Sequence, residues 1–219
     1  MNWELAILWF VTFVISVTVH EAAHAWFAML GGDRTAYNAG QVTLNPIPHM
    51  QREPFGMLVL PLLMLYLSNG TYCFGFAHAP IDPIWAYHHP KKAALMSAAG
   101  PLANLLLAAI AFTMLWFIAR PDGETMVALR KIAGVFLFLN IVLFVFNLIP
   151  LPPLDGASVL TGLSRPARQF YDGLMRIPYM QLVILILLFS YAGRFILPVL
   201  WTVDDWLPYS LGAPPNAFR

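Results

Sequence analysis

The side chains best suited to chemistry lie in one short run, His20-Glu21-Ala-Ala-His24, inside a stretch that is otherwise almost wholly apolar. If this stretch is helical, His20 and His24 lie one turn apart and present both imidazoles on one face. Glu21 projects beside them, close enough to act on a water molecule bound to the same metal ion. Charged groups at membrane depth cost about 2–4 kcal/mol, so we expect a compensating function. The pattern predicts a zinc site within a bilayer. The alternative, two core histidines bonded to backbone or hydroxyl groups, leaves Glu21 unexplained.

A third ligand must come from elsewhere, because zinc used for hydrolysis takes three protein ligands and keeps one position open for water. Asp155 is the candidate, in Asn147-Leu-Ile-Pro-Leu-Pro-Pro-Leu-Asp155-Gly156. The prolines of this run end the preceding helix and force an extended path, and Gly156 lets the backbone turn directly afterwards. An isolated Asp-Gly pair is usually an ordinary turn. Asp155 is favoured as a ligand because the two-histidine motif lacks a third, and Glu53 is the next candidate.

The composition is typical of an integral membrane protein. Of the 219 residues, 59% are hydrophobic and only 11% are charged, whereas soluble domains carry roughly 25% charged residues. The net charge of +1 shows no bias towards nucleic acid. The single cysteine, Cys73, excludes an intramolecular disulfide and a cysteine-based zinc cluster. The N-terminus does not resemble a cleaved signal peptide, because residues 1–4 carry no Lys or Arg.

Four apolar segments are long enough to cross a bilayer, which takes about 20 helical residues. They run over about Glu4–Leu30, Ala93–Ala119, Ile132–Ile149 and Tyr179–Trp201. A fifth, Phe55–Leu67, is shorter and has a proline in its middle, so we expect it to be re-entrant, with a tilted fifth span left open. Short strands are predicted at 41–44 and 72–76, beside the zinc site. The expected fold is an all-α polytopic membrane protein with about four transmembrane helices, a re-entrant apolar segment and a small membrane-associated β element.

We expect one integral-membrane domain over residues 1–219, with a catalytic core at about 4–156 and a C-terminal helix at about 178–202. With four spans, the first and third helices run in the same direction, so His20 and Asp155 can meet at one depth. Loops 31–92 and 150–177 carry seven Lys and Arg residues, against four on the opposite side. The positive-inside rule therefore places these two loops in the cytoplasm.

These motifs together resemble the site-2 protease family of intramembrane zinc metalloproteases. The resemblance covers about residues 18–156 and rests on three motifs in the family's order. They are His20-Glu21-Ala-Ala-His24, Ala99-Gly100-Pro101 with Asn104, and Asn147-x-x-Pro150 leading to Leu154-Asp155-Gly156. The chain looks like the compact prokaryotic branch, which lacks a PDZ or CBS module. The resemblance implies one zinc ion per chain, bound by His20, His24 and Asp155, with Glu21 as general base.

The same resemblance implies an enzyme that hydrolyses peptide bonds within or next to transmembrane segments of membrane-protein substrates. It would be a multi-pass protein of the bacterial plasma membrane, with a transmembrane substrate and the lipid bilayer as partners, no nucleic acid, and an accessory regulator left open. The alternative is a non-catalytic membrane zinc-binding or chaperone-like protein that retains the motif, against which the intact Glu21 argues. A zinc transporter is disfavoured, because histidines and acidic residues do not follow a path across the other helices.

Three asparagines in apolar segments are further candidates. Asn147 could donate to the oxyanion or hold the substrate backbone, and an interhelical hydrogen bond is an equal alternative. Asn104 is expected to order the core or to support a zinc ligand. Asn140, two helical turns before Asn147, is expected to be structural. The other histidines lie in loops without ligand spacing, and we do not expect them to bind the catalytic metal: His49, His78, His88 and His89.

Overall fold

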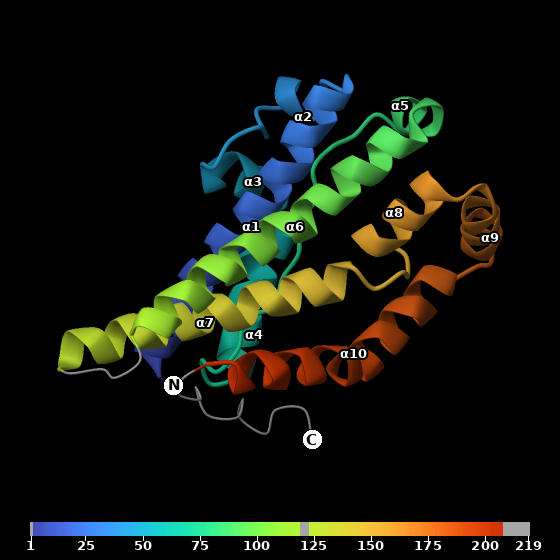
Figure 1. Cartoon of the computed structure of the whole chain (residues 1–219). Coiled ribbons are helices and arrows are strands. Elements are labelled where there is room, and N and C mark those ends of the chain that lie inside the picture. Colours follow the sequence, from blue (N-terminus) through green and yellow to red (C-terminus); the bar gives the residue numbers. More distant parts are fainter. Residues whose placement is uncertain (1, 119–122, 208–219) are drawn as a thin grey trace.

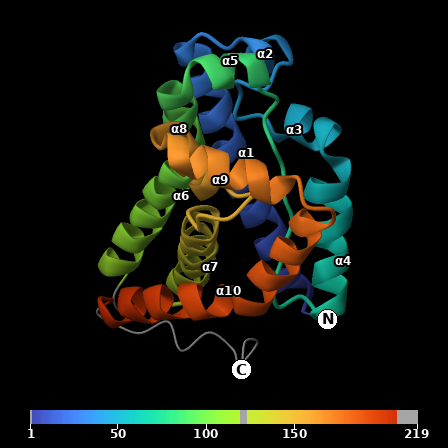
Figure 2. The ribbon, with the colours of Figure 1, turned by 90° about the vertical axis from the view of Figure 1, so that its right-hand side faces the viewer.

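The computed structural model describes residues 2–118 and 123–207, and the regular elements formed by these residues are all helical. Among the described residues, three helices are long and apolar enough to cross a membrane: α1 (Trp3–Gly31), α6 (Pro90–Phe117) and α7 (Glu124–Asn147). They overlap the first three predicted spans. The fourth predicted span falls on α10 (Met180–Asp205), which bends along its length in Figures 1 and 2. Because α10 is not among the three, the count of four spans stays a prediction.

Helix α6 packs against both α1 and α7 and joins them into one body (Figure 1). Alanines on α6 and α7, Ala108, Ala111 and Ala133, belong to a buried cluster shared with residues of α10. A second cluster includes Trp9 and Phe13 of α1. Small residues let membrane helices approach closely, and van der Waals packing then holds them together.

The two ends of α1 are defined by local capping. The Asn2 side chain accepts a hydrogen bond from the Leu5 amide at 3.1 Å, and Gly32 ends the helix with a left-handed φ of 106°. The Gly31 carbonyl accepts hydrogen bonds from Trp85 Nε1 at 3.2 Å and from Lys92 Nζ at 3.0 Å. Helix α6 therefore begins beside the C-terminal end of α1, and the two helices are antiparallel.

Between α1 and α6 the chain forms a helical descent and an extended return, which both lie along α1 in Figure 2. The elements are α2 (Thr35–Asn38), α3 (Pro46–Arg52), the π-helical turn η1 (Phe55–Val59), α4 (Leu60–Leu67) and α5 (Pro83–His88). The tip reaches the N-terminal end of α1, where the Asn2 amide donates to the Asn69 carbonyl at 3.4 Å. Phe55–Leu67 thus belongs to a segment that begins and ends at the same end of α1. The tip of this segment therefore lies near the end of α1 opposite to the one where α5 begins, and the cytoplasmic placement of the 31–92 loop stays a prediction.

The predicted β element is not formed by the described residues. In the run 41–44, Gln41 bonds to residues nearby in sequence: its amide donates to the Ala36 carbonyl at 2.9 Å and its side chain donates to the Pro48 carbonyl at 3.1 Å. Residues 72–76 are extended, but the Phe76 amide donates to the Gly56 carbonyl of η1 at 3.1 Å. Their neighbour is a helix rather than a second strand, so no ladder forms.

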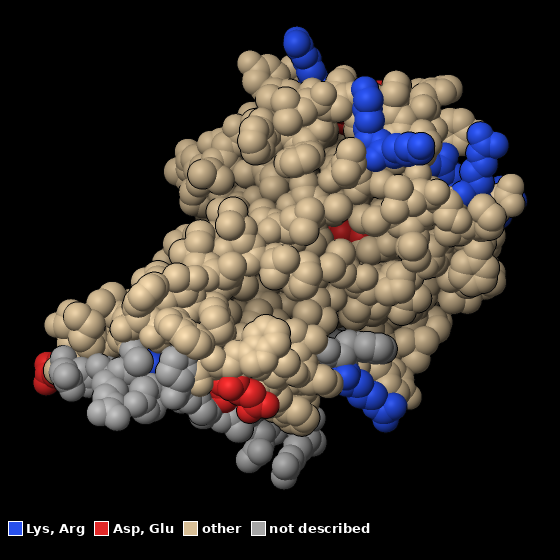
Figure 3. All heavy atoms as spheres, in the orientation of Figure 1, with Lys and Arg blue, Asp and Glu red and all other residues tan. Residues whose placement is uncertain are grey.

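Two short helices follow α7, and they are α8 (Asp155–Leu163) and α9 (Arg165–Met175). Helix α8 packs on α6, with Gly162 against the Pro90 carbonyl. The Tyr171 hydroxyl of α9 donates to the Pro150 carbonyl at 2.5 Å, which ties α9 to the loop before α8. Figure 3 shows several Lys and Arg gathered near α5, α8 and α9, a mostly uncharged middle of this face, and further charged side chains along its lower edge.

Candidate metal centre

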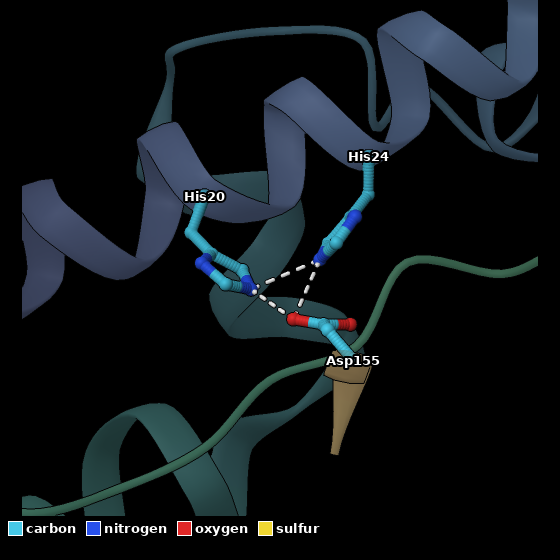
Figure 4. A group of neighbouring side chains, drawn as sticks. All are labelled: His20, His24 and Asp155. Carbon is cyan, nitrogen blue, oxygen red and sulfur yellow. Dashed lines mark hydrogen bonds and ion pairs between the residues drawn. The ribbon is translucent and has the colours of Figure 1, made fainter. Parts of the chain in front are cut away.

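Three side chains from two distant segments converge on one point (Figure 4). His20 and His24 lie one turn apart on α1, with their Nε2 atoms 2.9 Å apart. Asp155, the first residue of α8, places Oδ2 at 3.2 Å from Nε2 of His20 and 3.4 Å from Nε2 of His24. Both histidines are buried, and Asp155 is half-buried. The two-histidine motif and the Asp-Gly motif, predicted to meet, do so.

The three ligand atoms fit a zinc ion. The circle through them has a radius of about 1.8 Å, which is shorter than zinc–ligand distances of ~2.0–2.2 Å. His20, His24 and Asp155 could therefore hold one zinc ion between them, with a further position left for water. Two imidazoles and one carboxylate are also the donor set of known catalytic zinc sites.

The turn between α7 and α8 places Asp155 next to α1. Helix α7 ends at Asn147, and the proline-containing turn that follows allows α8 to begin at Asp155. Gly156 packs against the end of α7, where an ideal Cβ would lie 2.7 Å from the Ile149 carbonyl oxygen. Only a residue without a side chain allows this return.

The charge of Asp155 suits a metal ligand. Burial by itself raises the pKa of the Asp155 carboxyl, but the neighbouring His24 and His20 bring that pKa well below its usual range. The ionised carboxylate is also the form that binds a cation. Its Oδ2 lacks a hydrogen-bond donor among the described residues, which leaves lone pairs for a cation.

Both imidazoles are oriented from behind by an acceptor on α6. The Nδ1 atom of His24 donates to the Met96 carbonyl at 2.7 Å, and Nδ1 of His20 donates to Oδ1 of Asn104 at 2.5 Å. A ring that donates from Nδ1 keeps the lone pair of Nε2 for a metal ion. The contact between Asn104 and His20 agrees with the prediction that Asn104 supports a zinc ligand.

Glu21 is buried, with 4% of its surface exposed, and its Oε2 has no hydrogen-bond partner among the described residues. Leaving a buried polar atom unpaired costs about 1–3 kcal/mol, and more for a charged group. A carboxylate oxygen held in this way is available to a water molecule or a substrate group. This environment is what a general base next to a metal centre requires.

The structure does not connect the other candidates to this centre. The Asn147 side chain donates to the Leu143 carbonyl of its own helix at 2.9 Å. Glu53, the alternative ligand, lies 3.0 Å from Nδ1 of His78, and Nε2 of His49 contacts the Thr43 carbonyl oxygen at 3.0 Å.

Two residues next to the centre were not predicted to support it. Gly100 of α6 faces both imidazoles, because an ideal Cβ there would lie 2.6 Å from Nε2 of His20. Asn140 of α7, expected to be structural, accepts a hydrogen bond from Asn104 at 2.8 Å. The sequence could have indicated both residues, because a glycine or an asparagine is unusual in a long apolar helix. The spacing of residues within one helix does not reveal which residue of another helix they contact.

Comparison with known proteins places these features in a family context. Residues 8–127 and 117–188 match peptidase family M50. The protein named "Putative zinc metalloprotease YwhC" from Bacillus subtilis is 39% identical over 162 residues, which cover 71% of this chain and 68% of that protein. A protein named "Putative zinc metalloprotease Rip2" from Mycobacterium tuberculosis (strain H37Rv) is 32% identical over 196 residues, which cover 87% of this chain and 71% of that protein. The protein of that name in Mycolicibacterium smegmatis is 31% identical over 157 residues, with coverages of 71% and 57%. No solved structure matches the chain.

Proposed function

The chain belongs to peptidase family M50, the site-2 protease family, and we propose that it is an intramembrane zinc metalloprotease. Family membership and the names of its relatives support a membrane zinc metalloprotease. The finer proposal is that it hydrolyses peptide bonds within or next to transmembrane segments of other membrane proteins. The relatives compared are bacterial proteins, and the three apolar helices suit a multi-pass protein of the bacterial plasma membrane.

One observation carries the proposal: three ligand atoms converge inside an apolar bundle, and the residue that follows the first ligand is a buried carboxylate with one oxygen free of hydrogen bonds among the described residues. His20, His24 and Asp155 would hold the zinc ion, and Glu21 adds a buried oxygen without a partner. A site that only bound metal would not need Glu21. When bound, zinc would act as a Lewis acid and lower the pKa of water from 15.7 to about 7.

The residues around the ligand atoms have separable roles in the proposed reaction. Oε2 of Glu21 would take a proton from the attacking water and deliver it to the leaving amine. Asn104 and the Met96 carbonyl would keep both imidazoles in the orientation that leaves Nε2 free. Asn147 is the candidate for holding the substrate backbone, and it would exchange its bond to the Leu143 carbonyl for one to the substrate.

The substrate would have to unwind locally before cleavage. An amide inside a transmembrane helix is hydrogen-bonded within that helix and shielded from attack. Gly100 opens the α6 side of the site, because no side chain there occupies the space in front of the imidazoles. The substrate class is therefore a transmembrane segment that contains helix-weakening residues.

The variant Glu21→Gln tests the proposal against the alternative of a non-catalytic zinc-binding or chaperone-like protein. Gln keeps the shape but cannot accept the proton, and general acid–base steps are worth roughly 10²–10⁴-fold. We expect full zinc content and a turnover of a transmembrane substrate at least 100-fold lower than that of the wild type. Zinc binding with no cleavage by the wild-type protein, under conditions where a known family protease cleaves the same substrate, would favour the alternative.

A further inference from the structure

Behind His20, a chain of buried hydrogen bonds crosses three helices. Nδ1 of His20 donates to Oδ1 of Asn104, and Nδ2 of Asn104 donates to Oδ1 of Asn140 at 2.8 Å. Nδ2 of Asn140 donates to the Ser16 hydroxyl and to the Phe136 carbonyl, each at 2.9 Å. Ser16, Asn104 and Asn140 each have 0% of their surface exposed. The chain thus connects a candidate metal ligand on α1 with the backbone of α7.

The direction of every bond in this chain is fixed from its far end. A backbone carbonyl such as that of Phe136 can only accept, so the amide nitrogen of Asn140 must face it. The oxygen of Asn140 then faces Asn104 and requires the nitrogen of that amide, which also donates to the Ser16 carbonyl at 3.3 Å. The oxygen of Asn104 is left for His20, whose Nδ1 must carry the proton.

The opposite orientation of Asn104 would be incompatible with metal binding. Its amide nitrogen would face Nδ1 of His20 and would require an acceptor there, which moves the ring proton to Nε2. A protonated Nε2 has no lone pair for a metal ion. The orientation of one amide therefore decides whether His20 can act as a ligand.

We infer that Asn140 is a positioning residue of the metal centre: it holds the amide of Asn104 so that His20 keeps Nε2 free for the metal. This inference rests on the proposed zinc site and adds a residue of α7 to it. An asparagine that only joined helices could do so with a hydrogen bond in either direction. In this site two backbone carbonyls set the polarity. The Phe136 carbonyl orients the amide of Asn140, whose oxygen holds the nitrogen of Asn104 at 2.8 Å, and the Ser16 carbonyl accepts from the same nitrogen at the longer distance of 3.3 Å.

Zinc affinity of the purified full-length chain, measured by competition with a chelator, tests the inference through a double-mutant cycle. Loss of a residue that orients a metal ligand typically costs 10–100-fold in metal affinity, so we expect about a 10-fold loss for Asn140→Leu and at least that for Asn104→Ala. In the Asn104→Ala background, Asn140→Leu should cause no further loss, because Asn140 acts through Asn104.

The matched control is Thr12→Val. Thr12 is a fully buried polar residue of α1, one turn before Ser16, and its hydroxyl has no hydrogen-bond partner among the described residues. Zinc affinity should be unchanged in this variant. The unfolding temperature of the metal-free protein separates the two roles, because a merely structural asparagine would lower it without changing zinc affinity.

An affinity of Asn140→Leu within twofold of the wild type would overturn the inference while leaving the proposed protease intact, and so would losses that multiply in the double variant. A wild-type chain that binds no zinc would overturn both. If Asn140→Leu does not fold, Asn140→Ala decides, since it also removes the acceptor that faces the Asn104 amide. It should lower zinc affinity about 10-fold, and not at all in the Asn104→Ala background; an unchanged affinity in the otherwise wild-type chain would overturn the inference.

Discussion

Gly100 of α6 lies so close to His24 of α1 that a side chain at position 100 would collide with the imidazole. An ideal Cβ on Gly100 would lie 2.6 Å from Cε1 of His24 and closer still to its Nε2. The atoms in its way are the ones that would hold the metal, and both rings are fixed from behind by hydrogen bonds. The glycine is therefore required by the metal centre rather than by backbone conformation.

We predict that Gly100→Ala abolishes zinc binding at micromolar free zinc and abolishes proteolysis. The added methyl group would occupy the space of the ion or turn the imidazoles away from Asp155. Zinc content per chain after purification checks this result.

Gly173→Ala is the control for the Gly100 variant, because Gly173 lies in a helix and a Cβ there would meet nothing within 4 Å. Its zinc content should be unchanged and its stability about 0.5–1 kcal/mol higher, since Ala is favoured over Gly inside helices. Normal zinc content in Gly100→Ala would contradict the geometry of the centre.

Removal of any one ligand should release the metal. We expect His20→Ala, His24→Ala and Asp155→Ala each to bind zinc far more weakly than the wild type, because two protein ligands make a poor site. A chelator should inactivate the wild-type enzyme, and added zinc should restore activity. Unchanged zinc affinity in Asp155→Ala would show that the third ligand is another residue, and Glu53→Ala would then be measured.

The convergence of His20, His24 and Asp155 could be predicted, because a zinc site with two histidines needs a third ligand. Helical spacing places the histidines on one face, and the proline-rich turn before Asp155 lets the chain reverse at the end of α7. The packing of α7 against α1, which brings Asp155 to the histidines, is a contact between distant segments. The three long helices could be predicted equally well, because a hydrophobic run of this length has few other structures available to it.

The remaining features depend on contacts between segments far apart in sequence. The run at 72–76 has the composition of a strand, but its neighbour is η1, so no ladder forms. The partners of Asn140 on α6 and α1 lie 36 and 124 residues away, and no local pattern specifies them.

Asp33 provides a prediction about pH and stability. Its carboxylate accepts hydrogen bonds from the amides of Thr35 and Asp82, both at 2.8 Å, and so connects the end of α1 to the start of α5. Burial alone would raise the pKa of Asp33, but these hydrogen bonds bring it below its ordinary value of 3.8. A carboxyl whose pKa is lower in the folded state stabilises the fold above its unfolded pKa, and this stabilisation is lost as the pH falls through the folded pKa.

We therefore expect Asp33→Asn to lower the free energy of unfolding by about 1–3 kcal/mol at pH 7, because charge-assisted hydrogen bonds are lost. The difference from the wild type should shrink as the pH falls below 3.8. Unfolding in detergent at pH 7 and at acid pH measures both values. Asp172→Asn, at an exposed position of α9, is the control and should have no effect at either pH. A difference that does not change with pH would mean that the charge of Asp33 contributes nothing.

The last prediction concerns the segment between α1 and α6, which reaches the N-terminal end of α1 at Asn69 and returns to the C-terminal end at α5. If α1 spans the bilayer, Thr71 and His88 must lie on opposite sides, because both are exposed and they lie at opposite ends of the extended return. Cysteines introduced at these positions, in a Cys73→Ser background, should react with an impermeant maleimide from opposite faces of oriented vesicles. A span by Phe55–Leu67 without a return would place both cysteines on the same side. It would also reverse α6 relative to α1, against the contact of Lys92 with the Gly31 carbonyl. Labelling of both positions from one side would therefore contradict the re-entrant arrangement.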